Sequence, residues 1–438
     1  MSNRTVTRRH FIMSTALLAA GPAMGARAKP RVISPNEKLN IACIGVGGKG
    51  AVDVGGVSSE NIVALCDVDE KQAAGTFLKF PRARRYKDFR VMLDKEHGSI
   101  DAVTVSTPDN VHAVAAMAAI ELGKHVYVQK PLTHDIYEAR ALTKAAREYG
   151  VATHMGNQGH ASLGLWQLCD YVEQGVIGPV REVYCWTDRP GRFWKQNRQR
   201  PTDTPPIPDT LAWDLWLGPA PERPYHPTYL PDEWRGWWDF GCGALGDMGC
   251  HIMDPPYTAL KLGYPTSVEA EFGGGNDETY PAWSIIRFEF PARGSTPPVT
   301  MTWYDGGKPP PRPEGLSKDE VLGDSNTNGS LLVGEKGMLT CGSTADSPRL
   351  VPYGKVSTSA EPPDLPGHYQ EWLIACKGGT PAGGNFDYAG PFTEMVLLGN
   401  LAIRVGKRIE FDPVEMKVTN VPEANQYIRR DYREGWTL

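Results

Sequence analysis

The sequence predicts an α/β protein in which a doubly wound parallel sheet is followed by a second α/β domain with a mostly antiparallel sheet. Between residues 39 and 157, short apolar runs alternate with helical segments, as is typical of parallel strands joined by helices. Beyond residue 158, strand-like runs follow one another without helices between them, which favours antiparallel pairing. At 438 residues, the chain is long enough for two or three domains.

The first 28 residues have the pattern of an export signal. Arg8 and Arg9 precede an apolar run over residues 12–20, and Ala26 and Ala28 are small residues of the kind that a signal peptidase reads. The run is too short to span a membrane. We therefore expect a twin-arginine signal peptide over residues 1–28, recognised by the twin-arginine export machinery, and a periplasmic or otherwise exported protein after cleavage near Ala28. An uncleaved anchor or an amphipathic N-terminal helix is the alternative.

Composition excludes several classes of protein. Hydrophobic residues make up 41% and charged residues 22% of the chain, as in a soluble globular enzyme. The net charge of −5 becomes −9 without the four arginines of residues 1–28, and such an acidic chain argues against nucleic acid as a partner. None of the eight cysteines forms a C-x-x-C pair, so no metal site is expected and buried free thiols are favoured over disulfides.

A glycine-rich turn directly follows the first predicted strand. That strand, residues 39–44, runs into Gly45-x-Gly47-x-x-Gly50, and the next strand ends at Asp67, 22 residues after Gly45. Gly45 permits a tight turn, Gly47 lets backbone N–H groups approach a pyrophosphate, and Gly50 permits close packing of helix on strand. Asp67 is expected to bind the adenosine ribose and to repel a 2′-phosphate, which favours NAD over NADP. A glycine-rich turn without a nucleotide is the alternative. The predicted cofactor contacts in the turn are Gly45, Val46, Gly47, Gly48, Lys49 and Gly50.

Polar residues also follow later strands of the same sheet. The strand-like runs 101–106, 125–128 and 151–155 are each followed by residues able to hydrogen-bond a ligand. Because ligands bind at the carboxyl ends of parallel strands, these residues are expected beside the cofactor. We therefore predict a Rossmann domain over residues 39–157, preceded by a linker over residues 29–38. The predicted cofactor contacts outside the glycine turn are Asp67, Thr107, Pro108, His112, Gln129, Lys130 and Asn157.

The second domain, predicted over residues 158–438, contains an aromatic region and a reactive cluster. Residues 186–238 hold seven of the twelve tryptophans; most are expected in the core, and some are expected to stack on the apolar faces of a sugar. Asp247 and His251 are four residues apart, so they share one face of a helix, where a carboxylate can orient an imidazole. A helix-capping Asp and a core His form the alternative. Pro255 and Pro256 predict a kink or a short helix here.

Taken together, the motifs resemble those of the glucose–fructose oxidoreductase / inositol dehydrogenase family (Gfo/Idh/MocA). The glycine turn, Thr107-Pro108, Gln129-Lys130-Pro131 and Asp247-x-x-x-His251 occur in the family's order, and the resemblance covers roughly residues 39–405. It implies a Rossmann domain followed by an α/β domain whose open antiparallel sheet serves oligomerisation, so a homo-oligomer (a dimer or tetramer) is expected. Lys130 matches the lysine of the family's E-K-P signature, and Gln129 stands where that signature has glutamate.

The resemblance also implies the chemistry. An NAD-dependent sugar or polyol dehydrogenase would hold NAD tightly and oxidise a hydroxyl of a sugar, glycoside or polyol to a ketone by hydride transfer. His251, oriented by Asp247, would remove the hydroxyl proton, and Lys130 would stabilise the developing alkoxide. The predicted catalytic residues are thus Lys130, Asp247 and His251, and the predicted substrate contacts are His160, Arg189, Trp237, Trp238, Asp247 and His251. The alternatives are an NAD-dependent glycoside hydrolase that uses transient oxidation and elimination, and a non-catalytic sugar-binding relative.

Overall fold

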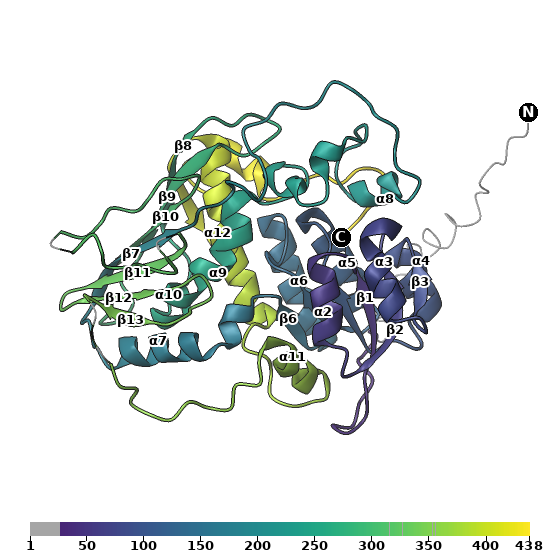
Figure 1. Ribbon diagram of the computed structural model, residues 1–438, viewed down its shortest axis with the longest axis horizontal. Helices are drawn as coiled ribbons and strands as arrows, with labels where there is room; N and C mark the ends of the chain where they lie inside the picture. The colour runs from purple at the N-terminus through teal and green to yellow at the C-terminus, as the bar shows by residue number, and fades with distance from the viewer. Residues whose placement is uncertain (1–26, 315, 326, 353, 355) are drawn as a thin grey trace, which may run out of the picture.

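A parallel sheet covered by helices on both faces forms the first half of the described chain (Figure 1). The computed structural model describes residues 27–314, 316–325, 327–352, 354 and 356–438, so nearly all of the predicted export signal lies outside the described residues. Six parallel strands in this part are arranged in the order β3-β2-β1-β4-β5-β6. The chain direction along the sheet reverses between β1 and β4, and this switch point opens a crevice for ligands.

The elements of this first sheet are short and regular. Its strands are β1 (Asn40–Ile44), β2 (Asn61–Cys66), β3 (Arg84–Tyr86), β4 (Ala102–Val105), β5 (His125–Val128) and β6 (Thr153–Met155). The helices between them are α2 (Lys49–Gly56), α3 (Glu70–Lys79), α4 (Phe89–Glu96), α5 (Asp109–Glu121) and α6 (Ile136–Tyr149).

Local sequence explains where several of these helices begin. Asp69 and Asp88 cap α3 and α4 by accepting backbone N–H groups of the first turn. Asp135 and Glu138 form a reciprocal capping box at the start of α6. Because α3, α4 and α6 all start directly after the carboxyl ends of strands or their loops, these caps fix the edge of the sheet where a ligand would bind.

The second half is built on a mixed sheet whose strands follow the order β13-β12-β11-β7-β10-β9-β8-β14-β15. Neighbouring strands pair antiparallel except for β7 and β10, which run parallel. The predicted fold class is therefore confirmed. The strands are β7 (Val180–Trp186), β8 (Ser267–Gly273), β9 (Trp283–Phe290), β10 (Val299–Tyr304), β11 (Gly329–Gly334), β12 (Met338–Cys341), β13 (Arg349–Val351), β14 (Ile409–Asp412) and β15 (Lys417–Val418).

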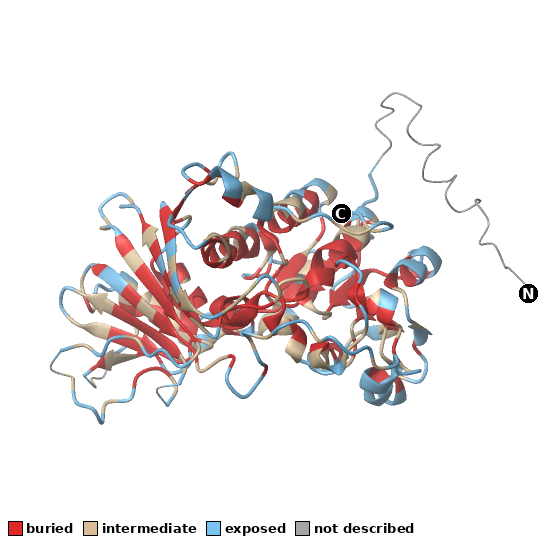
Figure 2. Cartoon of the chain, turned by 90° about the horizontal axis from the view of Figure 1, so that it is seen from above, coloured by how far each residue is buried: buried red, intermediate tan, exposed pale blue. Residues whose placement is uncertain are grey.

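The long helix α12 (Phe386–Val405) lies between the two sheets (Figures 1 and 2). It packs on α6 of the first domain and on β8 and β9 of the second, and almost all of its residues are buried. The buried Glu394 pairs with Arg140 of α6 at 2.6 Å. The other helices are α7 (Leu163–Glu173), α8 (Trp213–Leu217), α9 (Cys250–Ile252), α10 (Asp254–Ala259) and α11 (His368–Cys376), with the shorter turns η1 (Gln158–Ala161), η2 (Pro227–Tyr229), η3 (Glu233–Gly236), η4 (Leu245–Gly249) and η5 (Pro422–Tyr427).

The end of the chain returns to the first domain. Trp372 and Cys376 of α11 belong to the same buried apolar cluster as Leu39 and Ile41 beneath the parallel sheet. The last segment, residues 428–438, is anchored by Arg430, whose guanidinium pairs with Glu138 at 2.8 Å. Among the described residues, all eight cysteines are free thiols. No helix in this part of the chain is both long and apolar enough to cross a bilayer.

Candidate active site

A cavity of about 570 Å³ lies at the carboxyl ends of the parallel strands, and both halves of the chain line it. This volume falls in the range of about 300–1,000 Å³ that is usual for small-molecule sites. The first domain contributes the glycine turn and the residues that follow β2, β4 and β5, and the second contributes a cluster of charged and aromatic side chains. The predicted site residues on its wall are Gly45, Gly47, Gly48, Lys49, Asp67, Thr107, Pro108, Gln129, Lys130, Arg189, Asp247 and His251.

The glycine turn leaves backbone exposed to this cavity. At Gly45 (φ +74°) a Cβ atom would lie 2.5 Å from the Ser106 carbonyl oxygen, and at Gly50 it would lie 1.9 Å from that of Gly45, so the turn needs glycine at both positions. Gly48 faces open space, and no side chain caps the first turn of α2. Free N–H groups at a helix N-terminus suit a pyrophosphate, so these residues fit a dinucleotide.

Asp67 is held against the glycine turn from the end of β2. Its carboxylate accepts hydrogen bonds from the backbone N–H groups of Val46 (2.8 Å), Gly47 (3.1 Å) and Asp69 (2.9 Å). Burial raises its pKa, and these hydrogen bonds partly oppose that rise. Asp67 lines the cavity, and its contact with a ribose remains a prediction.

Gln129, which stands where the family signature has glutamate, makes a specific pair. Its Nε2 donates to both carboxylate oxygens of Asp53, at 3.0 and 2.9 Å, and Asp53 is fully buried on α2. The same carboxylate accepts from the hydroxyls of Ser106 and Tyr369 and pairs with Lys49 at 3.0 Å. A glutamate at position 129 would place two carboxylates in contact, so Asp53 gives a physical reason for the amide.

Lys130 and Asp247 meet in the cavity although 117 residues separate them. The Lys130 Nζ donates to the Asp247 backbone oxygen at 2.7 Å and to its Oδ1 at 2.8 Å. Arg235 Nε lies 3.1 Å from the same Oδ1, and Arg189 Nη1 lies 3.4 Å from Oδ2. Burial would raise the pKa of Asp247, but the charges of Lys130 and Arg235 outweigh it and hold that pKa well below its usual range.

His251 forms its hydrogen bond with a different residue from the one that its spacing suggested. Its Nδ1 lies 3.3 Å from Asn157 Oδ1, and because an amide oxygen only accepts, Nδ1 carries the proton and Nε2 is left as the basic nitrogen. Asp247 pairs with the three cations instead, so the prediction that Asp247 orients the His251 ring is corrected to Asn157. Burial and then the charge of Lys130 lower the pKa of His251 to about 3, so the ring is neutral at physiological pH.

Both residues come from a helical segment that is broken into short pieces. The π-helix η4 carries Asp247, α9 carries His251, and α10 begins with Asp254 ahead of Pro255 and Pro256. A π-type turn changes the direction of side chains relative to an α-helix and recurs at functional sites. The change of helix type is one reason why the two side chains have different partners.

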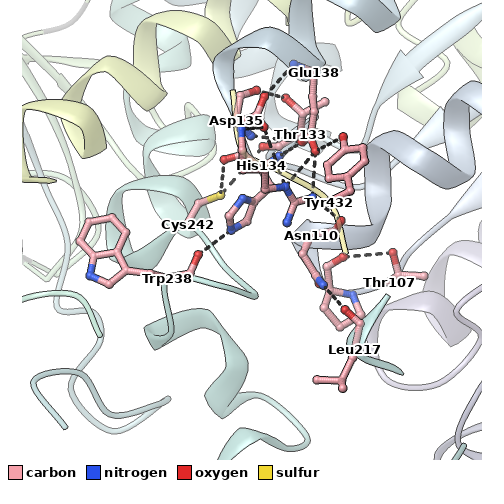
Figure 3. A network of polar contacts seen from close by, with 12 residues as sticks. Thr107, Asn110, Thr133, His134, Asp135, Glu138, Leu217, Trp238, Cys242 and Tyr432 are labelled. Carbon is pink, nitrogen blue, oxygen red and sulfur yellow. Dashed lines mark hydrogen bonds and ion pairs between the residues drawn. The ribbon is translucent and has the colours of Figure 1, made fainter. Parts of the chain in front are cut away.

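A network of polar contacts fixes the loop that follows Lys130 (Figure 3). The His134 Nε2 lies 2.8 Å from the Trp238 carbonyl oxygen, and the Cys242 thiol lies against the carbonyl oxygens of Thr133 and His134. Figure 3 also shows Tyr432 of the C-terminal segment directed at Glu138, to which it donates at 2.7 Å. Both halves of the chain therefore hold the segment that positions Lys130.

Several predicted site residues do not line the cavity. Trp237 is fully buried in the aromatic cluster around Tyr229, which leaves no ring face for a sugar. Trp238 lines a separate cavity of about 210 Å³ and packs against Tyr280, with ring centroids 3.6 Å apart and the ring planes tilted by 33°. Their predicted substrate contacts are corrected to packing roles, because the backbone after η3 directs one ring into the core and the other to the far side.

The two remaining histidine predictions are also corrected. His112 is buried and lies outside the cavity wall, and its ring nitrogens are each 2.9 Å from a carbonyl oxygen, those of Pro131 and Thr107, so it joins two loops of the site. His160 Nδ1 lies 3.0 Å from Asp254 Oδ1, with its ring packed on Tyr388. Val46, Gly50 and Asn157 also lie outside the cavity wall. The Val46 N–H donates to Asp67, Gly50 leaves room for the Gly45 carbonyl, and Asn157 contacts His251.

Sequence reasoning missed several residues on the cavity wall. Arg235 follows one of the noted tryptophans, but nothing local distinguishes it from a surface arginine. Asp109 begins α5, and its burial raises its pKa to about 7. Trp436 comes from the C-terminal segment and packs against Phe89, with ring centroids 6.1 Å apart. Other residues on the wall include Asp69, Gln72, Lys87, Asp88, Phe89, Asp109, Gln158, Trp216, Trp234, Arg235, Met248, Thr344 and Trp436. Among the described residues, no cluster of His, Cys, Asp and Glu could hold a metal ion.

Comparison with known proteins decides the family. Residues 39–157 match the model of the oxidoreductase family's NAD-binding Rossmann fold, and residues 166–295 match that of the same family's C-terminal α/β domain. The chain is a Gfo/Idh/MocA oxidoreductase. Its cofactor is therefore NAD-type, as the sequence predicted.

Known relatives include sugar-acting oxidoreductases, and solved structures share the fold. The chain is 26% identical over 193 residues to levoglucosan dehydrogenase of Pseudarthrobacter phenanthrenivorans, a match that covers 43% of this chain and 40% of the relative. It is 28% identical over 205 residues to a glycosyl hydrolase family 109 protein of Shewanella pealeana, covering 40% and 44%. The chain thus spans less than half of these relatives' length. The structure of the WlbA dehydrogenase from Bordetella pertussis with NADH and UDP-GlcNAcA shares the fold, with a TM-score of 0.59 and 18% identity over 86% of this chain and 99% of that one.

Proposed function

We propose that this Gfo/Idh/MocA oxidoreductase oxidises a hydroxyl group of a sugar, glycoside or polyol to a ketone. The observation that carries the proposal is the position of the Lys130 ammonium and the neutral His251 ring on the wall of the cavity that also contains the glycine turn. A neutral imidazole can accept a hydroxyl proton, and an ammonium group can stabilise the oxygen as it becomes negative. The levoglucosan dehydrogenase relative supports a carbohydrate substrate.

In this mechanism the two side chains divide the work on one oxygen atom. NAD, when bound, supplies the hydride acceptor. The His251 Nε2 accepts the hydroxyl proton, because its Nδ1 already donates to Asn157. The Lys130 Nζ has three N–H donors, of which two are used by Asp247, so the third can stabilise the oxygen as negative charge develops on it. Asp247 acts as a positioning residue that keeps Lys130 in place.

Retained, tightly bound NAD and a preference for NAD over NADP belong to the same proposal. Asp67 supports the preference, because a buried carboxylate beside the glycine turn would repel a 2′-phosphate. An exported enzyme meets no free pool of the cofactor, so export and tight binding would be consistent with each other.

The second candidate is an NAD-dependent glycoside hydrolase that oxidises its substrate transiently, eliminates the aglycone and returns the hydride. The similarity to a glycosyl hydrolase family 109 protein supports this second hypothesis. The same Lys130 and His251 would serve both reactions, so the site residues do not separate them. The product does: a dehydrogenase gives a ketone together with either one reduced cofactor or one reduced second carbonyl compound, and a hydrolase gives free sugar with no net reduction.

The test is a panel of sugars, polyols and nitrophenyl glycosides offered to the purified protein with NAD. Cofactor reduction is followed by absorbance and free sugar by chromatography. Lys130→Met and His251→Ala should abolish or strongly lower turnover while NAD still binds, because neither side chain belongs to the glycine turn. Lys144→Met and His97→Ala, which change exposed residues outside the cavity, are the matched controls. Release of free sugar without any keto product would replace the dehydrogenase by the hydrolase.

A further inference from the structure

The part of the cavity around Asp247 carries more positive than negative charge. Lys130, Arg189 and Arg235 all line it, and all three pair with the single carboxylate of Asp247. The side chain of Arg235 is half-buried, with 21% of its surface exposed, and Asp247 is buried. One negative charge therefore faces three positive charges in a partly desolvated site, in a chain whose overall net charge is −5.

The other carboxyl groups nearby do not balance this excess. Asp232 pairs with Arg235 Nη1 at 3.1 Å, but its side chain is 67% exposed, so solvent screens the pair. Asp188 Oδ1 lies 3.8 Å from Arg189 Nε, beyond hydrogen-bond length. Asp109 is fully buried, and burial raises its pKa to about 7, so it carries only part of a charge at neutral pH.

Arg189 is the least satisfied of the three cations. Its Nε is buried without a hydrogen-bond partner among the described residues, and its one bond to Asp247 is long, at 3.4 Å. One face of its guanidinium is covered by Phe193, with the guanidinium carbon 3.2 Å from the ring centroid. This contact restrains the guanidinium, and Arg189 still lines the cavity. A fixed planar fork of N–H donors matches the two oxygens of a carboxylate.

We propose that the substrate of this enzyme carries an anionic group, the carboxylate of a sugar acid, and that Arg189 binds it with the help of Arg235. This inference rests on the proposed function, since it names the substrate class of the same site. Lys130 is committed to the reacting oxygen and to Asp247, which leaves the two guanidinium groups for the anion. The local positive charge also attracts an anion that the acidic surface of the protein would otherwise repel.

The test compares sugars that differ only at one carbon. Binding of D-glucuronate against D-glucose, and of D-galacturonate against D-galactose, is measured by calorimetry on the NAD-loaded protein, and oxidation is followed by cofactor absorbance. We expect each sugar acid to bind at least tenfold more tightly than its neutral partner. Arg189→Gln should reduce that ratio to about threefold or less, and Arg189→Lys should restore part of it, because it returns the charge without the fork.

Arg192→Gln is the matched control. Arg192 lies on the same segment and its guanidinium stacks on the same ring, 4.9 Å from the Phe193 centroid, but it does not line the cavity. The ratio of sugar-acid affinity to neutral-sugar affinity should be unchanged in this variant. A fall in that ratio would show that loss of any nearby positive charge weakens binding, and it would overturn the specific role of Arg189. Failure of both sugar acids to bind more tightly than their neutral partners would overturn the proposal.

The remaining outcomes separate this inference from the proposed function. Oxidation of neutral sugars without a preference for acids would leave the dehydrogenase standing and remove the anionic substrate. Tight binding of a sugar acid without cofactor reduction would support the anion site and count against the dehydrogenase. D-Glucose 6-phosphate is included as a third arm, and tighter binding of this phosphate than of D-glucuronate would overturn the carboxylate assignment.

Discussion

Replacement of Gln129 by glutamate should destabilise the protein in a strongly pH-dependent way. The Nε2 of Gln129 lies 3.0 and 2.9 Å from the two carboxylate oxygens of the fully buried Asp53. Two charges at about 3 Å repel by about 5 kcal/mol even at an effective dielectric constant of about 20. Uptake of one proton by the pair is less costly. Protonation of a glutamate whose pKa is the ordinary value near 4.3 costs about 3.7 kcal/mol at pH 7 and about 1 kcal/mol at pH 5.

The sign of this pH dependence follows from linkage. The pKa of the carboxyl pair would be raised in the folded state, so the variant is least destabilised below about pH 4 and loses stability as the pH rises above it. We therefore expect Gln129→Glu to unfold at lower urea concentration than wild type at pH 7, by about 3–4 kcal/mol, and to approach wild type at pH 5. Asp53→Asn added to Gln129→Glu should recover at least half of the loss, because the new amide can donate to Glu in place of the old one.

Gln174→Glu is the control for this experiment. Gln174 Nε2 donates to the Asp170 carboxylate at 2.7 Å, but this pair is exposed, so the same change should cost less than about 1 kcal/mol. A cost at position 129 that is equal at pH 5 and pH 7 would refute the reasoning. So would a double variant less stable than Gln129→Glu alone.

Four further predictions test other parts of the site. His251→Ala should lower kcat by about a hundredfold. Because burial and Lys130 lower the pKa of His251 to about 3, the kcat/KM of the wild type should not fall as the pH is lowered through 6.5. A fall in kcat/KM near pH 6.5 would contradict a neutral buried ring. Asp67→Ser should narrow the preference for NAD over NADP in binding measurements, and a wild type that binds NADP more tightly would remove the assignment. Trp436→Ala should weaken binding of ADP-ribose by roughly threefold to tenfold, because the ring lines the same end of the cavity as Asp67; equal calorimetric affinities would make it a packing residue only. Changing both Arg8 and Arg9 to Lys should leave precursor in the cytoplasm of the cell that makes it, and an unchanged exported yield would exclude the twin-arginine route.

The predicted site differs from the observed one mainly in which side chains form hydrogen bonds with one another. Lys130, Asp247 and His251 do line one cavity, yet the i, i+4 spacing assigned the wrong neighbour to His251. That spacing describes an ideal α-helix, and the segment contains a π-helix. Asn157, the actual partner, follows β6 and lies 94 residues away in the chain, so no local pattern could have indicated it.

The sequence by itself determined those features of the protein that depend only on residues close together in the chain. Strand–helix alternation, the spacing of Gly45, Gly47 and Gly50, and the position of Asp67 at a strand end are properties of neighbouring residues, and backbone geometry then dictates a parallel sheet with a cofactor turn. The second sheet was predicted less completely, because the sequence indicated only the strands β9, β10 and β12 and not β7, β8, β11, β13, β14 and β15. Strands β7 and β11 lack clear alternation because neighbouring residues on both of their faces are buried.

Tertiary structure alone decided which side chains meet. Trp237 and Trp234 are three residues apart in one aromatic region, but packing buries the first and leaves the second on the cavity wall. The pairing of Gln129 with Asp53, and the convergence of Arg189 and Arg235 on Asp247, join residues from different elements. Such contacts depend on how helices and sheets pack, which is set by burial of apolar surface over the whole chain and not by the residues beside each group.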